Sequence, residues 1–80
     1  TVEASTRLDA IASAGFGLSR AKVVNQIKEG RLRLNWKLIK QTNRELKTGD
    51  RIQLENRGTV EIINLELTNR NRWRVELLRN

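Results

Sequence analysis

The first third of the chain spaces its apolar residues as a helix does. Leu8, Ile11 and Ala12 recur at intervals of three and four, which predicts a helix over residues 7–14 with these side chains on its buried face. Thr6 precedes this segment and is expected to be its N-cap, since a hydroxyl can accept a hydrogen bond from an unpaired N–H of the first turn.

The ends of the helices are signalled by polar residues and glycines. Asp9 suits the first turn of the first helix, where a carboxylate complements the helix dipole, and Gly15 and Gly17 are expected to end that helix. A second helix is predicted over residues 20–29, with Ser19 as its N-cap. The glycine that follows residue 29 is expected to stop it.

After residue 30 the apolar period changes from helical to alternating. In the stretch RLRLNWKLIK, leucines alternate with Arg31 and Arg33, which predicts a half-buried strand with both arginines on the solvent face. Residues 35–37 are expected to form a hairpin turn. Trp36 at its tip disfavours a positive φ, so we expect a loop that differs from the usual tight turn.

Alternation returns in the second half of the chain. A loop held by Leu46 is expected to lead into a strand at residues 51–55, with Ile52 and Leu54 facing inward. Segments 59–67 and 72–78 are predicted to form the last hairpin.

The apolar pattern also predicts the register of that hairpin. Opposite pairs are expected to be Thr68–Arg72, Leu67–Trp73, Glu66–Arg74, Leu65–Val75 and Ile63–Leu77. A bulge near residues 62–63 would explain why the apolar parity changes there, and Trp73 is expected to be a core residue. The fold class is therefore α+β, with two short helices packed on a small, mostly antiparallel sheet of about five strands.

The positive charge is concentrated in the middle of the chain. The 80 residues carry a net charge of +7, and residues 19–47 alone hold nine cations and two anions. Such segregation favours a polyanionic partner over an evenly solvated surface.

Composition argues against several other classes of function. The chain contains no cysteine and no histidine, and no pair of carboxylates has a spacing that indicates a catalytic site. We therefore predict that it is not an enzyme and expect neither a cofactor nor a metal site. No apolar run is long enough to span a membrane. The chain opens without methionine, and we expect residues 1–80 to be one domain excised from a longer protein.

Four short motifs resemble the S4-type RNA-binding domain. They are RLD at 7–9, SRAKV at 19–23, IKEGRLRLN at 27–35 and TGDRI at 48–52. The resemblance covers a core of residues 7–54, followed by a C-terminal hairpin extension at 58–80. The NWK turn and the extra hairpin are most similar to the C-terminal domain of YlmH-like proteins, including the photosystem II S4-domain proteins of cyanobacteria and plastids.

The resemblance implies a function, a location and a set of contact residues. It implies binding to structured RNA, either ribosomal RNA or tRNA, association with the ribosome, and a location in the bacterial cytoplasm or the plastid stroma. We assume that the domain is a monomer. The family's RNA surface lies on the second helix and the following hairpin. The matching positions here are Arg7, Ser19, Arg20, Lys22, Gln26, Arg33, Asn35 and Lys37, to which we add Trp36.

The cations at the start of the second helix also have a physical explanation. Arg20 and Lys22 stand against the helix dipole in the free protein, but a phosphate at the helix N-terminus would turn both into charge-assisted donors. Arg7 could instead pair with Asp9 or with a C-terminal carboxylate. Trp36 either stacks on an unpaired base or folds down over its own hairpin.

Two other functions remain open from the sequence. The final hairpin could dock a ribosomal or other protein partner through an exposed strand edge. Binding to a membrane surface is less favoured, because the apolar face of the second helix is needed for the core.

Overall fold

The computed structural model describes residues 2–79, in which two helices lie against one face of a six-stranded antiparallel sheet. The elements, in chain order, are β1 (Val2–Glu3), α1 (Leu8–Phe16), α2 (Arg20–Lys28), β2 (Leu32–Leu34), β3 (Lys37–Leu38), β4 (Arg51–Leu54), β5 (Gly58–Leu67) and β6 (Trp73–Arg79). The strand order across the sheet is β1-β6-β5-β4-β2-β3. The α+β prediction is therefore confirmed.

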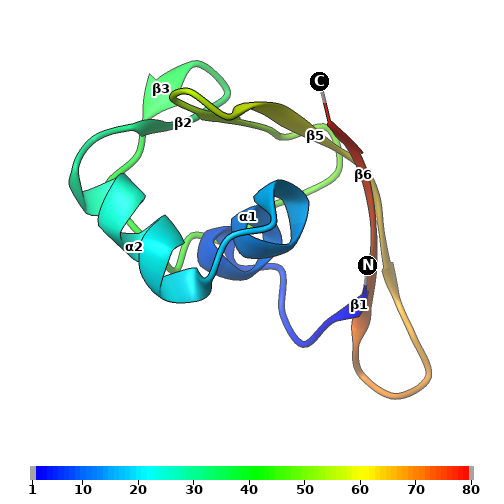
Figure 1. Cartoon of the computed structure of the whole chain (residues 1–80). Coiled ribbons are helices and arrows are strands. Elements are labelled where there is room, and N and C mark those ends of the chain that lie inside the picture. Colours follow the sequence, from blue (N-terminus) through cyan, green and yellow to red (C-terminus); the bar gives the residue numbers. More distant parts are fainter. Residues whose placement is uncertain (1, 80) are drawn as a thin grey trace.

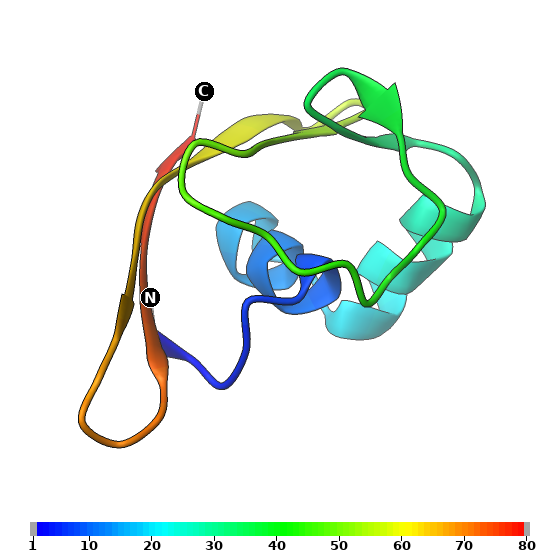
Figure 2. The same ribbon diagram turned by 180° about the vertical axis from the view of Figure 1, so that it is seen from behind.

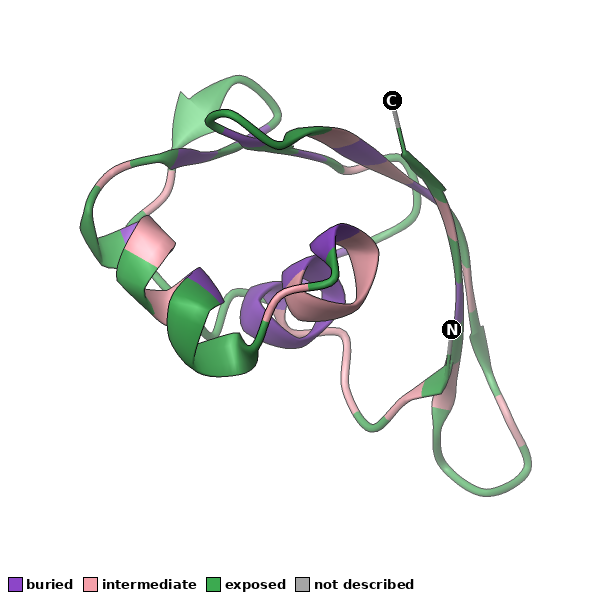
Figure 3. Ribbon diagram, viewed as in Figure 1, coloured by how far each residue is buried: buried purple, intermediate pink, exposed green. Residues whose placement is uncertain are grey.

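The sheet arches over the helices, and the β5–β6 ribbon bends away from them towards its tip (Figure 1). Viewed from behind, the long segment between β3 and β4 crosses in front of the helices (Figure 2). The buried positions lie between the helices and the near part of the sheet (Figure 3). The largest fully buried side chains are those of Leu8, Ile11, Val23, Ile27, Leu32, Ile52, Leu54, Val60 and Ile62.

The start of α1 differs from the prediction because the chain caps it through tertiary contacts. Thr6 is not the N-cap: Arg7 occupies that position and makes no side-chain capping bond. The N–H of Leu8 instead donates to the carbonyl of Arg44 at 2.8 Å, and the N–H of Asp9 donates to that of Thr42 at 3.2 Å. Carbonyl groups of the loop thus accept hydrogen bonds from N–H groups that would otherwise bond to a capping side chain.

The two glycines of α1 have different roles. Gly15 does not end the helix, contrary to expectation; it lies inside it, where an added Cβ would be 3.1 Å from both methyl groups of Val60. Gly17, at φ 68°, does end the helix, and its N–H donates to the carbonyl of Ser13. The missing side chain at position 15 lets α1 approach β5 closely.

The second helix and its neighbouring strands follow the sequence pattern. Ser19 is the N-cap of α2, and its hydroxyl accepts from the N–H of Lys22 at 3.2 Å. In β2 and β4 the leucines and Ile52 are buried while the intervening residues are exposed. These predictions are confirmed, together with the burial of Leu46.

The β2–β3 turn is tighter than the sequence led us to expect. Asn35 and Trp36 have φ values of 50° and 71°, and the flanking residues Leu34 and Lys37 pair directly. A two-residue turn with both φ values positive is the usual tight hairpin turn, so the expectation drawn from Trp36 was wrong. The Asn35 amide holds it, donating to the Asp50 carboxylate and accepting from the N–H of Arg51, both at 3.0 Å.

The last hairpin has the predicted register up to the bulge. Thr68 bonds to Arg72 across the loop, and the pairs from Leu67–Trp73 to Leu65–Val75 are as expected. The register then shifts between Ile62 and Asn64, so Leu77 faces Ile62 rather than Ile63. Ile63 is the extra residue of this bulge and is exposed.

Two features at the edge of the sheet were missed. The two-residue strand β1, too short to show a pattern, pairs with Trp73 and Arg74 and becomes a sixth strand. Trp73 is half-buried rather than a core residue. Its part of the ribbon lies beyond the reach of the helices (Figure 1), so its prediction as core was wrong.

Candidate nucleic-acid interface

One buried carboxylate joins the starts of the two helices. Asp9 is only 4% exposed, and its Oδ2 lies 3.1 Å from Nη2 of both Arg7 and Arg20. Arg20 at the N-terminus of α2 therefore has a carboxylate partner inside the protein. The alternative in which Arg7 pairs with Asp9 is what the structure shows.

This cluster keeps an excess of positive charge. Two guanidinium groups share one carboxylate, and the side chains of Arg7 and Arg20 remain 43% and 56% exposed. The Nε of Arg7 is buried without a hydrogen-bond partner within residues 2–79. Both side chains are thus held in place by Asp9 while part of each guanidinium stays available to an anion.

A polar hollow of about 180 Å³ lies between α2 and the β4–β5 turn. Its lining residues are Leu18, Lys22, Gln26, Arg31, Leu54, Glu55, Asn56 and Arg57. Lys22 and Gln26 are one helical turn apart and therefore share a face of α2, as expected. The hollow brings this face together with two further cations, Arg31 and Arg57, from separate segments of the chain.

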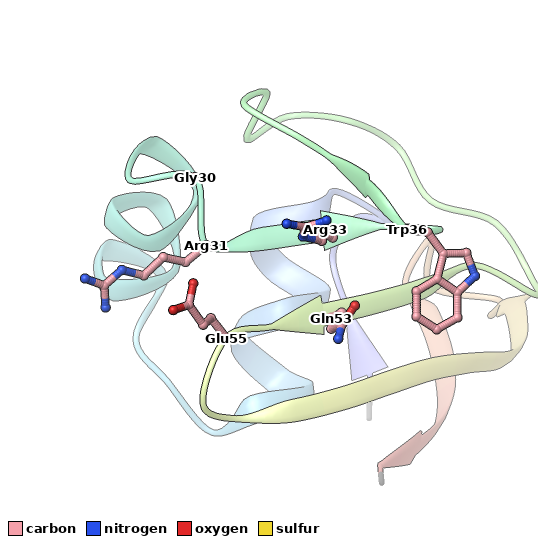
Figure 4. Close-up of a pocket in the computed structure, with 6 residues that line it drawn as sticks. All are labelled: Gly30, Arg31, Arg33, Trp36, Gln53 and Glu55. Atoms are coloured by element: carbon pink, nitrogen blue, oxygen red, sulfur yellow. The ribbon is translucent and has the colours of Figure 1, made fainter.

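A second hollow of about 460 Å³ lies on the outer face of the sheet (Figure 4). Its lining residues are Gly30, Arg31, Arg33, Trp36, Gln53 and Glu55. Arg31 and Glu55 line both hollows, so the two adjoin each other. We call the residues that line them the Arg31 surface.

Strand pairing explains why this surface is polar. Arg33 of β2 and Gln53 of β4 are direct cross-strand partners, and both project from the outer face of the sheet (Figure 4). The leucines beside them point the other way, into the core. The surface carries four cations and one carboxylate, from Lys22, Arg31, Arg33, Arg57 and Glu55. Its formal charge is therefore +3.

The predicted contact residues fall into three groups. Lys22, Gln26, Arg33 and Trp36 meet on the Arg31 surface. Arg7, Ser19 and Arg20 lie at the starts of the helices, two in the Asp9 cluster and one as a cap.

The third group is Asn35 and Lys37, which lie neither on the Arg31 surface nor at the starts of the helices. The Asn35 amide is engaged inside the protein by Asp50 and Arg51. Lys37 is exposed on β3, opposite the inward-facing Leu34, and does not line either hollow.

Sequence reasoning missed several residues of the Arg31 surface. Gln53, Glu55, Asn56 and Arg57 were not among the predicted contacts. The alternation in RIQLE did signal that Gln53 faces outward, but not that β4 would pair with β2. That pairing joins strands separated by a long loop, and no local pattern encodes it.

Other classes of site find no support in the described part of the chain. Within residues 2–79 no group of three or more acidic residues is placed to hold a metal ion. No helix there is long and apolar enough to cross a membrane.

The family profile of the S4 domain matches residues 6–52, more than half of the chain. The chain belongs to the S4 domain family. The S4 domain is a general RNA-binding domain and, by itself, a non-catalytic module. The matched segment contains both helices, the β2–β3 hairpin and the Asp9 cluster.

A solved structure shares the fold. The chain resembles a protein described as a pseudouridylate synthase, with a TM-score of 0.64 and 23% sequence identity. The match covers 71% of this chain and 24% of that one, so this domain spans about a quarter of that protein's length. The search of curated proteins found no match.

Proposed function

We propose that this S4 domain binds structured RNA, ribosomal RNA in particular, through the Arg31 surface and the adjoining Asp9 cluster. The observation that carries the proposal is that three separate segments, α2, β2 and the β4–β5 turn, contribute cations to two adjoining hollows. Folded RNA is recognised largely by shape and by its backbone, and a compact cationic surface on short elements suits that mode.

The charge distribution supports the same surface. Residues 6–52, which match the family, hold eleven cations and four anions, whereas the remaining residues hold five of each. All of the net charge of +7 thus belongs to the family segment. Phosphate contacts release counterions, so the affinity is expected to fall steeply as salt concentration rises.

The test compares two double variants that each remove two positive charges. Lys22→Ala/Arg57→Ala alters the Arg31 surface, and Arg70→Ala/Arg72→Ala alters the tip of the β5–β6 hairpin as a matched control. Binding to a structured ribosomal RNA fragment would be measured over a series of salt concentrations, after circular dichroism has shown that both variants fold.

The expected result is asymmetric. The first variant should bind more weakly and lower the slope of log affinity against log salt by about 2, roughly one per lost phosphate contact. The hairpin variant should bind like the unmodified chain. Equal losses in both variants would contradict a localised interface, and a salt-independent affinity would contradict phosphate binding altogether.

We further propose that the parent protein is YlmH-like and acts on the ribosome, in the bacterial cytoplasm or the plastid stroma, with the domain as a monomer. The support is the resemblance of the NWK turn and the extra C-terminal hairpin to the C-terminal domain of YlmH-like proteins. In this structure the β5–β6 hairpin lies beyond the family segment.

A protein-binding role of that hairpin is the second candidate. Leu67 is 55% exposed and lies directly opposite the half-buried Trp73, on the same face of the ribbon near its free end. Such an exposed apolar pair suits a protein contact. This reading predicts that Leu67→Ala, and not the Lys22/Arg57 variant, abolishes retention on ribosomal particles.

A further inference from the structure

The indole of Trp36 lies mostly in solvent, outside the hydrophobic core. Its side chain is 66% exposed, the most exposed large apolar residue within residues 2–79. Its backbone φ of 71° lies in the left-handed region, which is unfavourable for a bulky side chain and which glycine would adopt freely. A strained backbone that carries an exposed aromatic ring points to a role outside the fold.

The surroundings of Trp36 are polar and cationic. In the outer hollow the ring lies at one end, Arg33 and Gln53 project between, and Arg31 and Glu55 lie at the other end (Figure 4). The volume of about 460 Å³ falls within the roughly 300–1,000 Å³ typical of small-ligand sites. The site therefore offers a flat apolar face, hydrogen-bonding groups and positive charge in one small space.

We propose that this hollow holds a single unpaired nucleotide of the bound RNA, with its base stacked on Trp36. This inference rests on the proposed function and adds a site for one extruded base to an interface otherwise built for backbone phosphates. The sheet's outer face provides the site, whereas the other phosphate contacts are assigned to α2, the β4–β5 turn and the helix starts.

Four of the six lining residues have a defined task in this arrangement. The indole face stacks on the base, an interaction that tolerates any base because all bases have a flat π surface. The Gln53 amide can both donate to and accept from the base edge. Arg33 and Arg31 supply donors for the phosphate of the same nucleotide, and Arg31 keeps an exposed guanidinium although Glu29 lies 3.5 Å from it.

A paired duplex cannot use this site, because its bases are stacked within the helix. The proposal therefore predicts a preference for RNA with an unpaired nucleotide next to the duplex that the Arg31 surface binds. An RNA hairpin would be prepared in two forms, one fully paired and one with a single unpaired adenosine in the stem. Binding of both would be measured for the 80-residue chain and for Trp36→Gly.

Glycine is the suitable replacement because it removes the ring and relieves the backbone at φ 71°. Trp36→Gly should lose about 5- to 150-fold in affinity for the bulged RNA, the range expected for one stacked base. Its affinity for the fully paired RNA should not change. Leu38→Ala is the matched control, since Leu38 is an exposed apolar residue of the same hairpin that does not line the hollow.

Fluorescence gives a second reading that does not depend on affinity. The chain has two tryptophans, so in a Trp73→Phe background the emission reports Trp36 alone. The bulged RNA should quench this emission and the paired RNA should not.

The outcomes separate the two proposals. If both RNAs bind equally well and neither quenches Trp36, the nucleotide site is wrong while the proposed function stands. If neither RNA binds, the proposed function fails and this inference fails with it.

Discussion

The segment matched by the S4 family and the β5–β6 ribbon differ in both charge and burial. Eleven of the fifteen buried apolar residues lie within residues 6–52, and so does the whole net positive charge. Four of the six exposed large apolar residues, Val2, Ile63, Leu67 and Leu78, lie outside it. The family segment thus combines a dense core with a charged surface, whereas the ribbon has four cations, three anions and an uncovered end.

The two regions meet at α1. Val60 and Ile62, at the near end of the ribbon, are fully buried under the helices, while Leu67 at the far end is 55% exposed. The same strand is therefore part of the core in one half and a surface feature in the other. Burial follows the reach of the helices rather than the composition of the strand.

The largest expected effect comes from truncating the core of the family segment. Ile27→Ala should lower the free energy of unfolding by about 2–5 kcal/mol, because a fully buried side chain leaves a cavity. Leu67→Ala at the far end of the ribbon should lower it by no more than about 0.5 kcal/mol. Urea denaturation of both variants measures the difference. Similar losses would mean that the ribbon tip is as much a part of the core as α2.

The next effect concerns the carboxylate that joins the helix starts. Asp9→Asn should lower the free energy of unfolding by about 1–3 kcal/mol, since it leaves two arginines facing a neutral amide in a buried place. The matched change on the ribbon is Glu66→Gln, whose exposed cross-strand partner is Arg74. That variant should differ from the parent by under about 0.5 kcal/mol. Urea denaturation at low salt measures both differences. If the Asp9→Asn variant were as stable as the parent, the Asp9 cluster would make no contribution to stability.

A smaller effect is expected where the two regions touch. Gly15→Ala gains about 1 kcal/mol in helix propensity, but its Cβ would lie 3.1 Å from the methyl groups of the buried Val60. Overpacking of this kind costs about 1–3 kcal/mol, so a net loss of about 1 kcal/mol is expected. Gly15→Ala/Val60→Ala should recover part of what the two single variants lose. Thermal unfolding of the three variants would show whether the contact limits the approach of α1.

The smallest effect has the opposite sign. Trp36→Gly should raise the free energy of unfolding by about 0.5–1 kcal/mol, because glycine adopts φ 71° without strain and the indole contributes little burial. Thermal unfolding measures the gain. A loss of stability would mean that the ring supports the hairpin, and it would weaken the argument for a nucleotide site.

Local patterns predicted the elements whose residues act through their neighbours in the chain. Ser19 caps α2 through an N–H three residues away, and the alternation around Arg33 sorts each side chain to one face of β2. The apolar pattern predicted the register of the last hairpin correctly as far as the bulge, because apolar residues pair with each other on both sides of a short loop. The S4 motifs, lying in order along the chain, indicated the family in the same way.

The predictions that were wrong concern positions whose conformation depends on residues distant in the chain. Thr6 is a residue type that often caps helices, but the carbonyl groups of residues 42 and 44 already accept the hydrogen bonds of N–H groups in the first turn of α1. Trp36 disfavours a tight turn, yet the Asn35 amide holds one by donating to Asp50 and accepting from the N–H of Arg51.

By itself, then, the sequence determined the two helices, the alternating strands, the family and the concentration of charge, since each depends on spacing or composition within a short window. Only the tertiary structure decided which charges lie together. The pairing of β2 with β4 and the fold-back of the β4–β5 turn against α2 bring Arg31, Gln53 and Arg57 to one surface. Long-range pairing depends on the packing of the whole core, and no local segment of the chain specifies it.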